Sequence, residues 1–217
     1  MEMPIVSQLI RRWTASREPR MTDTQHARHY LDKIAEAASL ISADVVEEMA
    51  SLLASTRAAG GRLFILGVGG SAGNAGHAVN DFRKLCGIES YAPTDNVSEL
   101  TARTNDEGWS TVFSEWLKVS NACPKDAILV LSVGGGNAER GISMNLVSAI
   151  DLAKENGLKV FGVVGRSDGH TAKNADLSVI VPSLNDNWQT PISEAFQSIV
   201  WHCLVSHPLL QKQDTTW

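Results

Sequence analysis

The sequence predicts an α/β fold, a three-layer α/β/α arrangement that is doubly wound around a five-stranded parallel sheet. Short apolar runs of strand length recur along the 217 residues, segments of helical periodicity separate most of them, and glycine clusters follow two of them. Runs that are apolar throughout suit strands buried on both faces, as in parallel sheets covered by helices. Because strands that alternate with helices are joined by right-handed crossovers, we expect repeated βαβ units.

Two amphipathic helices are expected first, between Thr22 and Ala59. Their apolar residues recur at spacings of three and four, which gathers them on one face of each helix: Ala27, Tyr30, Leu31, Ile34 and Ala38, then Val45, Val46, Met49, Leu52 and Leu53. The preceding residues 1–20 hold four arginines and are interpreted as an N-terminal arm, either an oligomer contact or a disordered start. Residues 21–217 are then expected to form one domain.

Five apolar runs are expected as strands, the second weaker than the rest: residues 62–67, 88–92, 127–133, 159–165 and 177–181. A last helix is expected from about Pro191 to Val205, because Pro208 cannot continue it. Ligands of doubly wound sheets bind beyond the carboxyl ends of the strands, where the strand order reverses. The loops after the first and third strands are therefore the first places to look for a site.

Composition excludes several classes of protein. With 24 acidic against 19 basic residues and a net charge of −5, the chain has no general cationic field for a nucleic-acid partner. No stretch approaches the roughly 18 apolar residues of a membrane span, and no signal-peptide pattern opens the chain, so we expect a soluble protein without a membrane partner. Three cysteines, Cys86, Cys123 and Cys203, form no CxxC pair and are interpreted as free thiols in a reducing cytoplasm.

The first glycine-rich loop, Gly67-Val-Gly-Gly-Ser-Ala-Gly-Asn74, follows the first predicted strand and leads into a helix near Ser71. Glycines let a ligand approach the backbone closely, and free amides at a helix start favour a phosphate. The spacing matches neither the dinucleotide pattern GxGxxG nor the nucleotide pattern GxxxxGK[ST], which disfavours NAD and nucleotide triphosphates. A tight strand-to-helix turn without a ligand is the alternative.

A second loop strengthens the phosphate interpretation. Ser132-Val-Gly-Gly-Gly-Asn137 follows the third strand, and Ser143 lies where the next helix is expected to begin. Because both loops lie at the same edge of the sheet, they can cradle one phosphate without a lysine. Nearby polar residues suit the hydroxyl groups of a sugar, so the sequence predicts a sugar-phosphate ligand.

Three stretches of the chain match one family: GVGGSAGNAGHAVNDF from Gly67, LTARTNDEGWSTVF from Leu100 and NADLSVIVP from Asn174. Through them the chain resembles the sugar isomerase (SIS) domain of phosphoheptose isomerases, and the resemblance covers residues from about 22 to 210. The resemblance implies a flavodoxin-like SIS fold, a small homotetramer, and aldose-ketose isomerisation of a seven-carbon sugar phosphate such as sedoheptulose 7-phosphate. It also implies a site that often holds Zn²⁺.

By position, the resemblance assigns substrate contacts to two glycine-rich loops and to an Asn-Asp pair: Gly69, Gly70, Ser71, Asn105, Asp106, Ser132, Gly134 and Ser143. The family has Ser-Thr-Ser where this chain has Ser132-Val133-Gly134. Ser143 matches a later serine of the family only after an insertion of about seven residues, between Gly134 and Gly141.

The resemblance also assigns metal ligands and catalytic groups. The family's glutamate, four residues after a histidine, is replaced here by Asp81, four residues after His77, and residues at this spacing share one helical face. On the last helix Glu194 replaces a glutamine and His202 follows eight positions later, and all four side chains are candidate Zn²⁺ ligands. Aldose-ketose isomerisation needs a base, for which Asp81 and Glu194 are candidates, and an acid, for which His202 is the candidate.

Glu194 and His202 are too far apart to share one ion. Eight residues of helix span about 12 Å, whereas Zn²⁺ bonds are about 2 Å long, so one of the two is expected to serve a neighbouring subunit. An alignment shifted by one residue would offer Ser193 and Trp201, which have no acid-base capacity. The remaining histidines are expected to be structural: His26, His29, His170 and His207.

Two other functions stay open at the level of sequence. One is a catalytically silent SIS tetramer that binds a protein partner, resembling bacterial proteins that associate with a replication initiator. The other is a sugar-phosphate sensor, although no DNA-binding segment is evident. Retention of His77, Asp81, Glu194 and His202 favours the isomerase.

Overall fold

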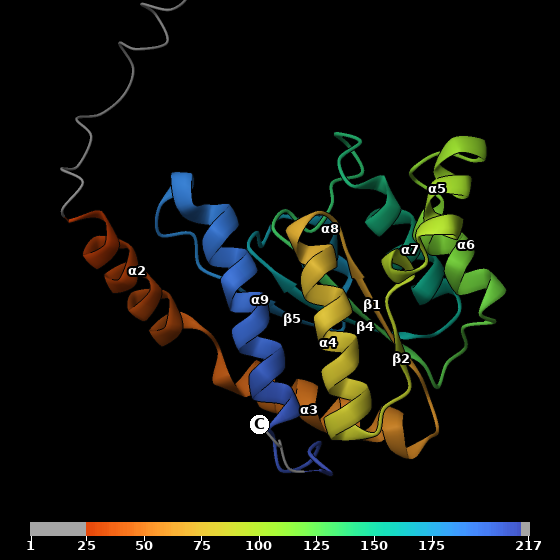
Figure 1. The fold of residues 1–217 in the computed structure, drawn as a ribbon, viewed down its shortest axis with the longest axis horizontal. Helices are drawn as coiled ribbons and strands as arrows, with labels where there is room; N and C mark the ends of the chain where they lie inside the picture. Colours follow the sequence, from red (N-terminus) through yellow and green to blue (C-terminus); the bar gives the residue numbers. More distant parts are fainter. Residues whose placement is uncertain (1–24, 214–217) are drawn as a thin grey trace, which may run out of the picture.

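The computed structural model describes residues 25–213, so the predicted arm at residues 1–20 lies outside the described residues. The centre of the fold is a parallel sheet of five strands in the order β2-β1-β3-β4-β5, which confirms the predicted fold (Figure 1). The strands lie where apolar runs predicted them: β1 Leu63–Gly67, β2 Ser90–Tyr91, β3 Ala127–Ser132, β4 Lys159–Val164 and β5 Leu177–Ile180. The second run, which is the weakest in the sequence, forms only a two-residue strand.

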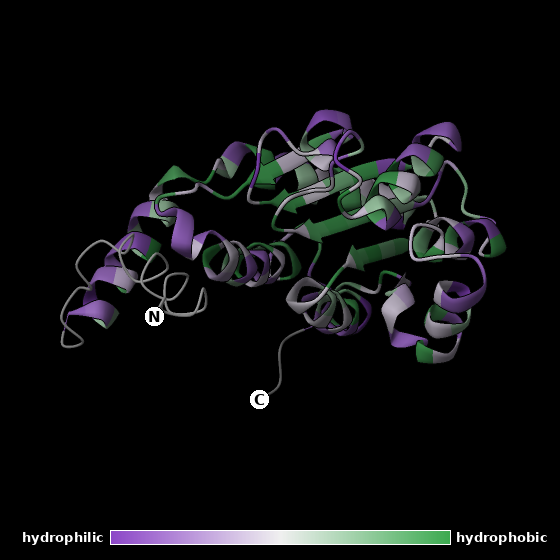
Figure 2. Ribbon diagram, turned by 90° about the horizontal axis from the view of Figure 1, so that it is seen from above, coloured by the Kyte–Doolittle hydropathy of each residue, from purple (hydrophilic) through white to green (hydrophobic). Residues whose placement is uncertain are grey.

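Helices cover both faces of the sheet, so the apolar strands lie between two helical layers (Figure 2). One face carries α3, α4 and α9, with α2 outside them, and the other carries α6 and α7. The helices and short 3-10 turns have these bounds: α2 His26–Leu40, α3 Ala43–Ala58, α4 Gly70–Cys86, η1 Pro93–Asp95, α5 Val97–Asp106, α6 Val112–Val119, α7 Met144–Glu155, α8 His170–Asn174, η2 Asp186–Trp188 and α9 Gln189–Val205.

The side chains of β1 contribute to two hydrophobic cores, one on each face of the sheet. Successive side chains of a strand point to opposite faces. Leu63 and Ile65 join the cluster beneath α4 and α9, whereas Phe64 and Leu66 join the cluster beneath α6 and α7. All residues of β1 and β3 are buried, which is why both strands are apolar without interruption.

The strand register brings the two glycine-rich loops together. Gly67, the last residue of β1, pairs with Leu131, the penultimate residue of β3. Since β2 flanks β1 on its other side, the strand order reverses between β1 and β3. The loops after these strands thus begin side by side at the point where doubly wound sheets bind ligands, as predicted.

At the opposite edge of the sheet, an ion pair between Arg62 and Asp126 joins the starts of β1 and β3. Asp126, which is fully buried, accepts hydrogen bonds from the Arg62 backbone N (2.8 Å) and guanidinium Nη2 (2.7 Å). It also accepts one from the Cys123 backbone N at 3.0 Å. Burial alone would raise the pKa of Asp126, but the bonds from Arg62 and Cys123 outweigh it and hold this pKa below the ordinary value.

The cysteines of the chain are free, as predicted. Cys86 is buried, and its burial raises the pKa of its thiol to about 11. Between residues 25 and 213, no helix combines the length and the apolar character that crossing a membrane requires.

Replacing Asp126 with asparagine should lower the free energy of unfolding at neutral pH by about 1–3 kcal/mol, because hydrogen bonds to a charged group are lost. An aspartate with a lowered pKa stabilises the fold above its unfolded pKa. The difference between wild type and variant should therefore shrink once the pH falls below about 4, and vanish below the folded-state pKa. Denaturant unfolding across pH measures this. As a control, Asp168→Asn breaks an exposed pair with Arg166 and should have little effect; equal losses in both variants would contradict the prediction.

Candidate active site

Helices α4 and α9 lie side by side and run in the same direction (Figure 1). At the start of α4, Gly70 faces the carboxylate of Glu194, which lies in the second turn of α9. At their last turns the Cys86 thiol donates to the Val205 carbonyl, with an S to O distance of 3.7 Å. The two helices therefore stay in contact along their length, and side chains at matching levels of the pair meet.

The buried side-chain amide of Gln197 fixes the position of α9 along α4. The Gln197 side chain is fully buried, donates to Ser71 Oγ (3.0 Å) and accepts from Asn74 Nδ2 (2.8 Å). Asn74 Nδ2 also donates to the Glu194 carbonyl at 3.0 Å. Sliding one helix along the other would leave these buried polar groups unpaired, which costs about 1–3 kcal/mol for each group.

Sequence reasoning missed Asn74 and Gln197. In the sequence Asn74 belongs to a glycine-rich loop, and Gln197 lies in no predicted motif. The available signal was spacing: each polar residue lies three positions after another candidate, Asn74 after Ser71 and Gln197 after Glu194.

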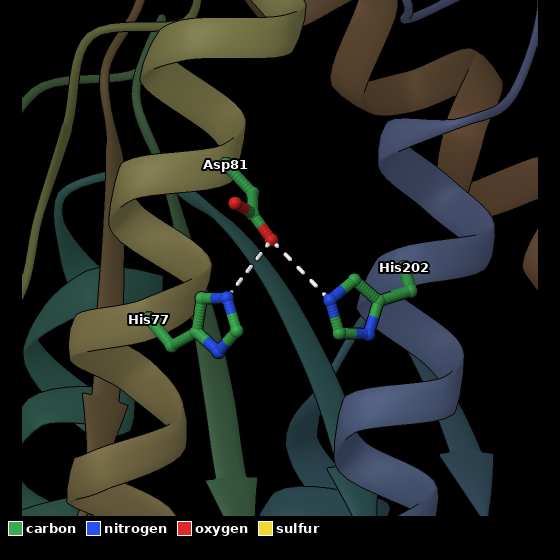
Figure 3. A group of neighbouring side chains, drawn as sticks. All are labelled: His77, Asp81 and His202. Carbon is green, nitrogen blue, oxygen red and sulfur yellow. Dashed lines mark ion pairs between the residues drawn. The ribbon is translucent and has the colours of Figure 1, made fainter. Parts of the chain in front are cut away.

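About two turns beyond Ser71 along α4, the side chains of three predicted metal ligands come together. His77 and Asp81 come from α4 and His202 from α9, and Figure 3 shows both imidazole rings turned toward one carboxylate oxygen. Asp81 Oδ2 lies 3.5 Å from His77 Nε2 and 3.5 Å from His202 Nε2. Asp81 is 8% exposed, whereas the two histidine side chains are about half exposed. The cluster is thus reachable from solvent but anchored in the protein.

The donor set fits a zinc ion. One possible ligand atom from each of His77, Asp81 and His202 lies within 4.8 Å of the others. Ligands about 2.0–2.2 Å from a tetrahedral Zn²⁺ lie roughly 3.3–3.6 Å from one another, close to the observed 3.5 Å. Two imidazoles and one carboxylate would leave a fourth position for water or substrate, which is typical of catalytic zinc sites.

The Asp81 carboxylate has further partners. Asn80 Nδ2 donates to Oδ1 at 3.0 Å, and the indole N of Trp201 donates to Oδ2 at 3.2 Å. Both oxygens are therefore engaged by the protein.

Glu194, the fourth predicted ligand, lies apart from this cluster. A Cβ atom built on Gly70 would come within 2.6 Å of both Glu194 carboxylate oxygens, so the carboxylate lies directly against the Gly70 backbone. Gly70 opens α4, and a negative group is favourable at the start of a helix. Gly69 before it has φ +63°, a conformation that glycine adopts without strain.

The predicted substrate-binding residues divide between buried and open positions. Ser71 is 2% exposed, with its oxygen directed to Gln197, so it lies inside the contact between α4 and α9. Ser132 Oγ accepts a hydrogen bond from Gly135 N at 3.0 Å and shapes the second loop. The inserted residues close on themselves through paired backbone bonds between Asn137 and Ile142.

Both ends of this loop are closely packed or constrained. A Cβ on Gly169 would collide with the Gly134 carbonyl, so the loops after β3 and β4 approach each other closely. Ser143 precedes α7 with φ +49°, in the left-handed region that non-glycine residues seldom adopt.

Asn105 and Asp106 are not brought to the histidine cluster. They end α5, which packs against η1 and α6 and buries none of its residues. Asn105 Nδ2 donates to Asp106 Oδ1 at 2.7 Å. Their predicted contact with substrate stays a prediction.

The four histidines expected to be structural have partners outside the cluster. His170 pairs with Asp151 and His207 with Glu47. His26 and His29 lie against the Trp188 ring.

Comparison with known proteins gives consistent results. A family model for the SIS domain matches residues 28–165. The lincomycin biosynthesis protein LmbN of Streptomyces lincolnensis is 32% identical over 197 residues, which cover 86% of this chain and 70% of that protein. The phosphoheptose isomerase of Rhodospirillum rubrum is 32% identical over 167 residues, 75% of this chain and 83% of the relative.

Solved structures share the fold. Phosphoheptose isomerase GmhA from Neisseria gonorrhoeae has a TM-score of 0.74 and 23% identity, over 85% of this chain and 97% of its own. A phosphoheptose isomerase from Francisella tularensis has a TM-score of 0.73 and 24% identity, with the same coverage of both chains.

If the cluster binds Zn²⁺, His202→Ala should weaken binding by at least about tenfold, because one of three ligands is lost. Calorimetric titration of chelator-treated protein with ZnCl₂ measures the affinity. His170→Ala is the matched control, since His170 also pairs with an aspartate but lies outside the cluster. Wild-type affinity in the His202 variant would rule out a metal ion at this position.

Proposed function

Because this chain belongs to the phosphoheptose isomerase branch of the SIS domain family and is a sugar-phosphate isomerase, we propose that it converts sedoheptulose 7-phosphate into D-glycero-D-heptose 7-phosphate. The observation that carries this proposal is the cluster of His77, Asp81 and His202, two turns along α4 from the first glycine loop. From Gly70 to His77 the helix rises about 10 Å. A substrate that spans phosphate-binding loops and this cluster needs its phosphate far from its reacting carbons, which favours a long sugar.

The reaction moves a carbonyl group between C1 and C2 through an enediolate. A base takes the carbon-bound proton from one carbon and returns it to the other, while the negative charge on oxygen is stabilised. We assign His77, Asp81 and His202 to a divalent metal, Zn²⁺ by preference. A bound metal would polarise the substrate carbonyl and stabilise the charge that develops on its oxygen.

Glu194 is then the preferred base. Its carboxylate lies outside the metal cluster and is therefore free to accept a proton. Because about 12 Å of helix separates it from His202, we propose that it serves a substrate held at the metal cluster of a neighbouring subunit. Asp81 is the alternative base. His202 cannot donate a proton from the ring nitrogen that binds a metal, so its two candidate roles, ligand and acid, exclude each other.

A panel of ketose phosphates with five, six and seven carbons, followed by NMR in D₂O, tests the proposal. We expect the seven-carbon ketose to be isomerised fastest, with deuterium entering at C1 or C2. Faster conversion of a shorter sugar would contradict the substrate, and conversion of none would favour a silent binding protein. In the same assay, Glu194→Gln removes the candidate base while keeping the size of the side chain.

We expect Glu194→Gln to keep its zinc and to lose turnover and deuterium exchange by about 10²-fold or more, as expected for a general base. Asp81→Asn should lose zinc and turnover together, because a neutral amide is a poor ligand. Elemental analysis of both variants accompanies the assay. Wild-type turnover of Glu194→Gln, with exchange lost in a zinc-replete Asp81→Asn protein, would make Asp81 the base.

We further propose a homotetramer in the cytoplasm. Three free cysteines are typical of a reducing compartment. Large apolar side chains are exposed on α2 and α9, including Leu31, Leu40 and Ile199. Ile199 also lines an apolar groove between α9 and the junction of α2 with α3, with a volume of about 220 Å³. Exposed apolar surface that clusters in this way is typical of subunit contacts.

Light scattering should give about four times the chain mass of 23.4 kDa. Ile199→Glu should reduce this mass, because a carboxylate would be buried in the contact. Val119→Glu, an exposed position on α6, is the control. A stable monomer at micromolar concentration would exclude the tetramer.

A further inference from the structure

Trp201 has no role in the reaction proposed above, yet it lies against the centre of the metal cluster. Its side chain is 1% exposed, and its only polar atom, the indole N, donates to Asp81 Oδ2 at 3.2 Å. Its ring centroid lies 5.4 Å from that of His77 and 5.0 Å from that of His202. One side chain therefore contacts all three candidate ligands.

The Trp201 indole donates its hydrogen bond to the Asp81 oxygen that is placed to bind a metal. Oδ2 is the Asp81 oxygen that lies 3.5 Å from both histidine nitrogens, whereas Oδ1 is held by Asn80. A carboxylate oxygen can accept along two lone-pair directions, and an indole N–H can only donate. Trp201 can thus occupy one direction and leave the other for a metal, without competing as a ligand.

The Asp81 side chain is short and is held at both ends of its carboxylate. A single methylene joins this carboxylate to the backbone of α4, Asn80 Nδ2 donates to Oδ1, and the Trp201 indole N donates to Oδ2. A carboxylate held at both oxygens has little freedom to turn about its side-chain bonds. Trp201 directly precedes His202 on α9, so one helix carries both this donor and a candidate ligand.

We propose that Trp201 is a positioning residue: its indole N–H holds Asp81 Oδ2 between His77 and His202, so that this oxygen can bind a divalent metal. This inference rests on the proposed metal site. Groups that orient metal ligands typically contribute about 10- to 100-fold to metal affinity.

Trp201→Phe tests the inference, because phenylalanine keeps an aromatic ring and removes the donor. Trp116→Phe is the matched control. The indole N of Trp116 is buried without a hydrogen-bond partner among the described residues, so this change removes an indole donor without breaking a hydrogen bond. Chelator-treated proteins are titrated with ZnCl₂ by calorimetry and with CoCl₂ by visible absorption, which reports the geometry around the ion.

We expect Trp201→Phe to bind Zn²⁺ about 10- to 100-fold more weakly than wild type and to change the Co²⁺ spectrum, while Trp116→Phe behaves as wild type. If wild type binds Zn²⁺ tightly and Trp201→Phe has the same affinity and the same Co²⁺ spectrum, the role of Trp201 is overturned and the metal site stands. Wild-type protein that binds Zn²⁺ no more tightly than His77→Ala would instead reject the metal site, and this inference with it.

Indole ¹H–¹⁵N spectra of the wild-type chain give a second test that does not require Trp201→Phe to fold. The chain has six tryptophans, so the Trp201 signal can be assigned by elimination from variants of the other five. We expect this signal to shift when Zn²⁺ is added and again in Asp81→Asn, whereas the Trp116 signal stays in place. A Trp201 signal that responds to neither change would overturn the inference.

Discussion

The buried Gln197 side chain, bonded to both Ser71 and Asn74, is the contact on which the site depends. It fixes how far α9 lies along α4. A shift of one residue along a helix rotates each side chain by about 100°, because 3.6 residues make a turn. Such a shift would turn His202 away from Asp81 and Glu194 away from Gly70. The polar network therefore fixes the register of the two helices. Because its side-chain amides are hydrogen-bonded to one another or to Ser71, they can be buried in the core.

Once this register is set, the two helices carry two separate chemical sites. Near the sheet edge, Glu194 faces the glycine that opens α4. Farther along, His77, Asp81 and His202 face one another. The chain thus keeps a free carboxylate apart from a cluster suited to a metal. An isomerase can use this separation, since a base that is bound to a metal loses its ability to accept a proton.

Each acidic group of the site has a neighbour that suits it. The Asp81 carboxylate accepts a hydrogen bond from Trp201, which packs against both histidines of the cluster. The Glu194 carboxylate lies beside Gly70 at the start of α4, where a negative group is favourable.

The sequence by itself determined the α/β fold, the position of every strand and the loops at which to look for a ligand. It could do so because apolar runs and glycine clusters are local features that report burial and backbone freedom directly. His77 and Asp81 could also be paired from sequence, since four residues separate them on one helix. Only the tertiary structure decided that His202 joins them while Glu194 does not, that Ser71 faces Gln197, and that Trp201 bonds to Asp81. These contacts join residues about 120 positions apart, and their geometry depends on the packing of α9 against α4, which no local pattern encodes.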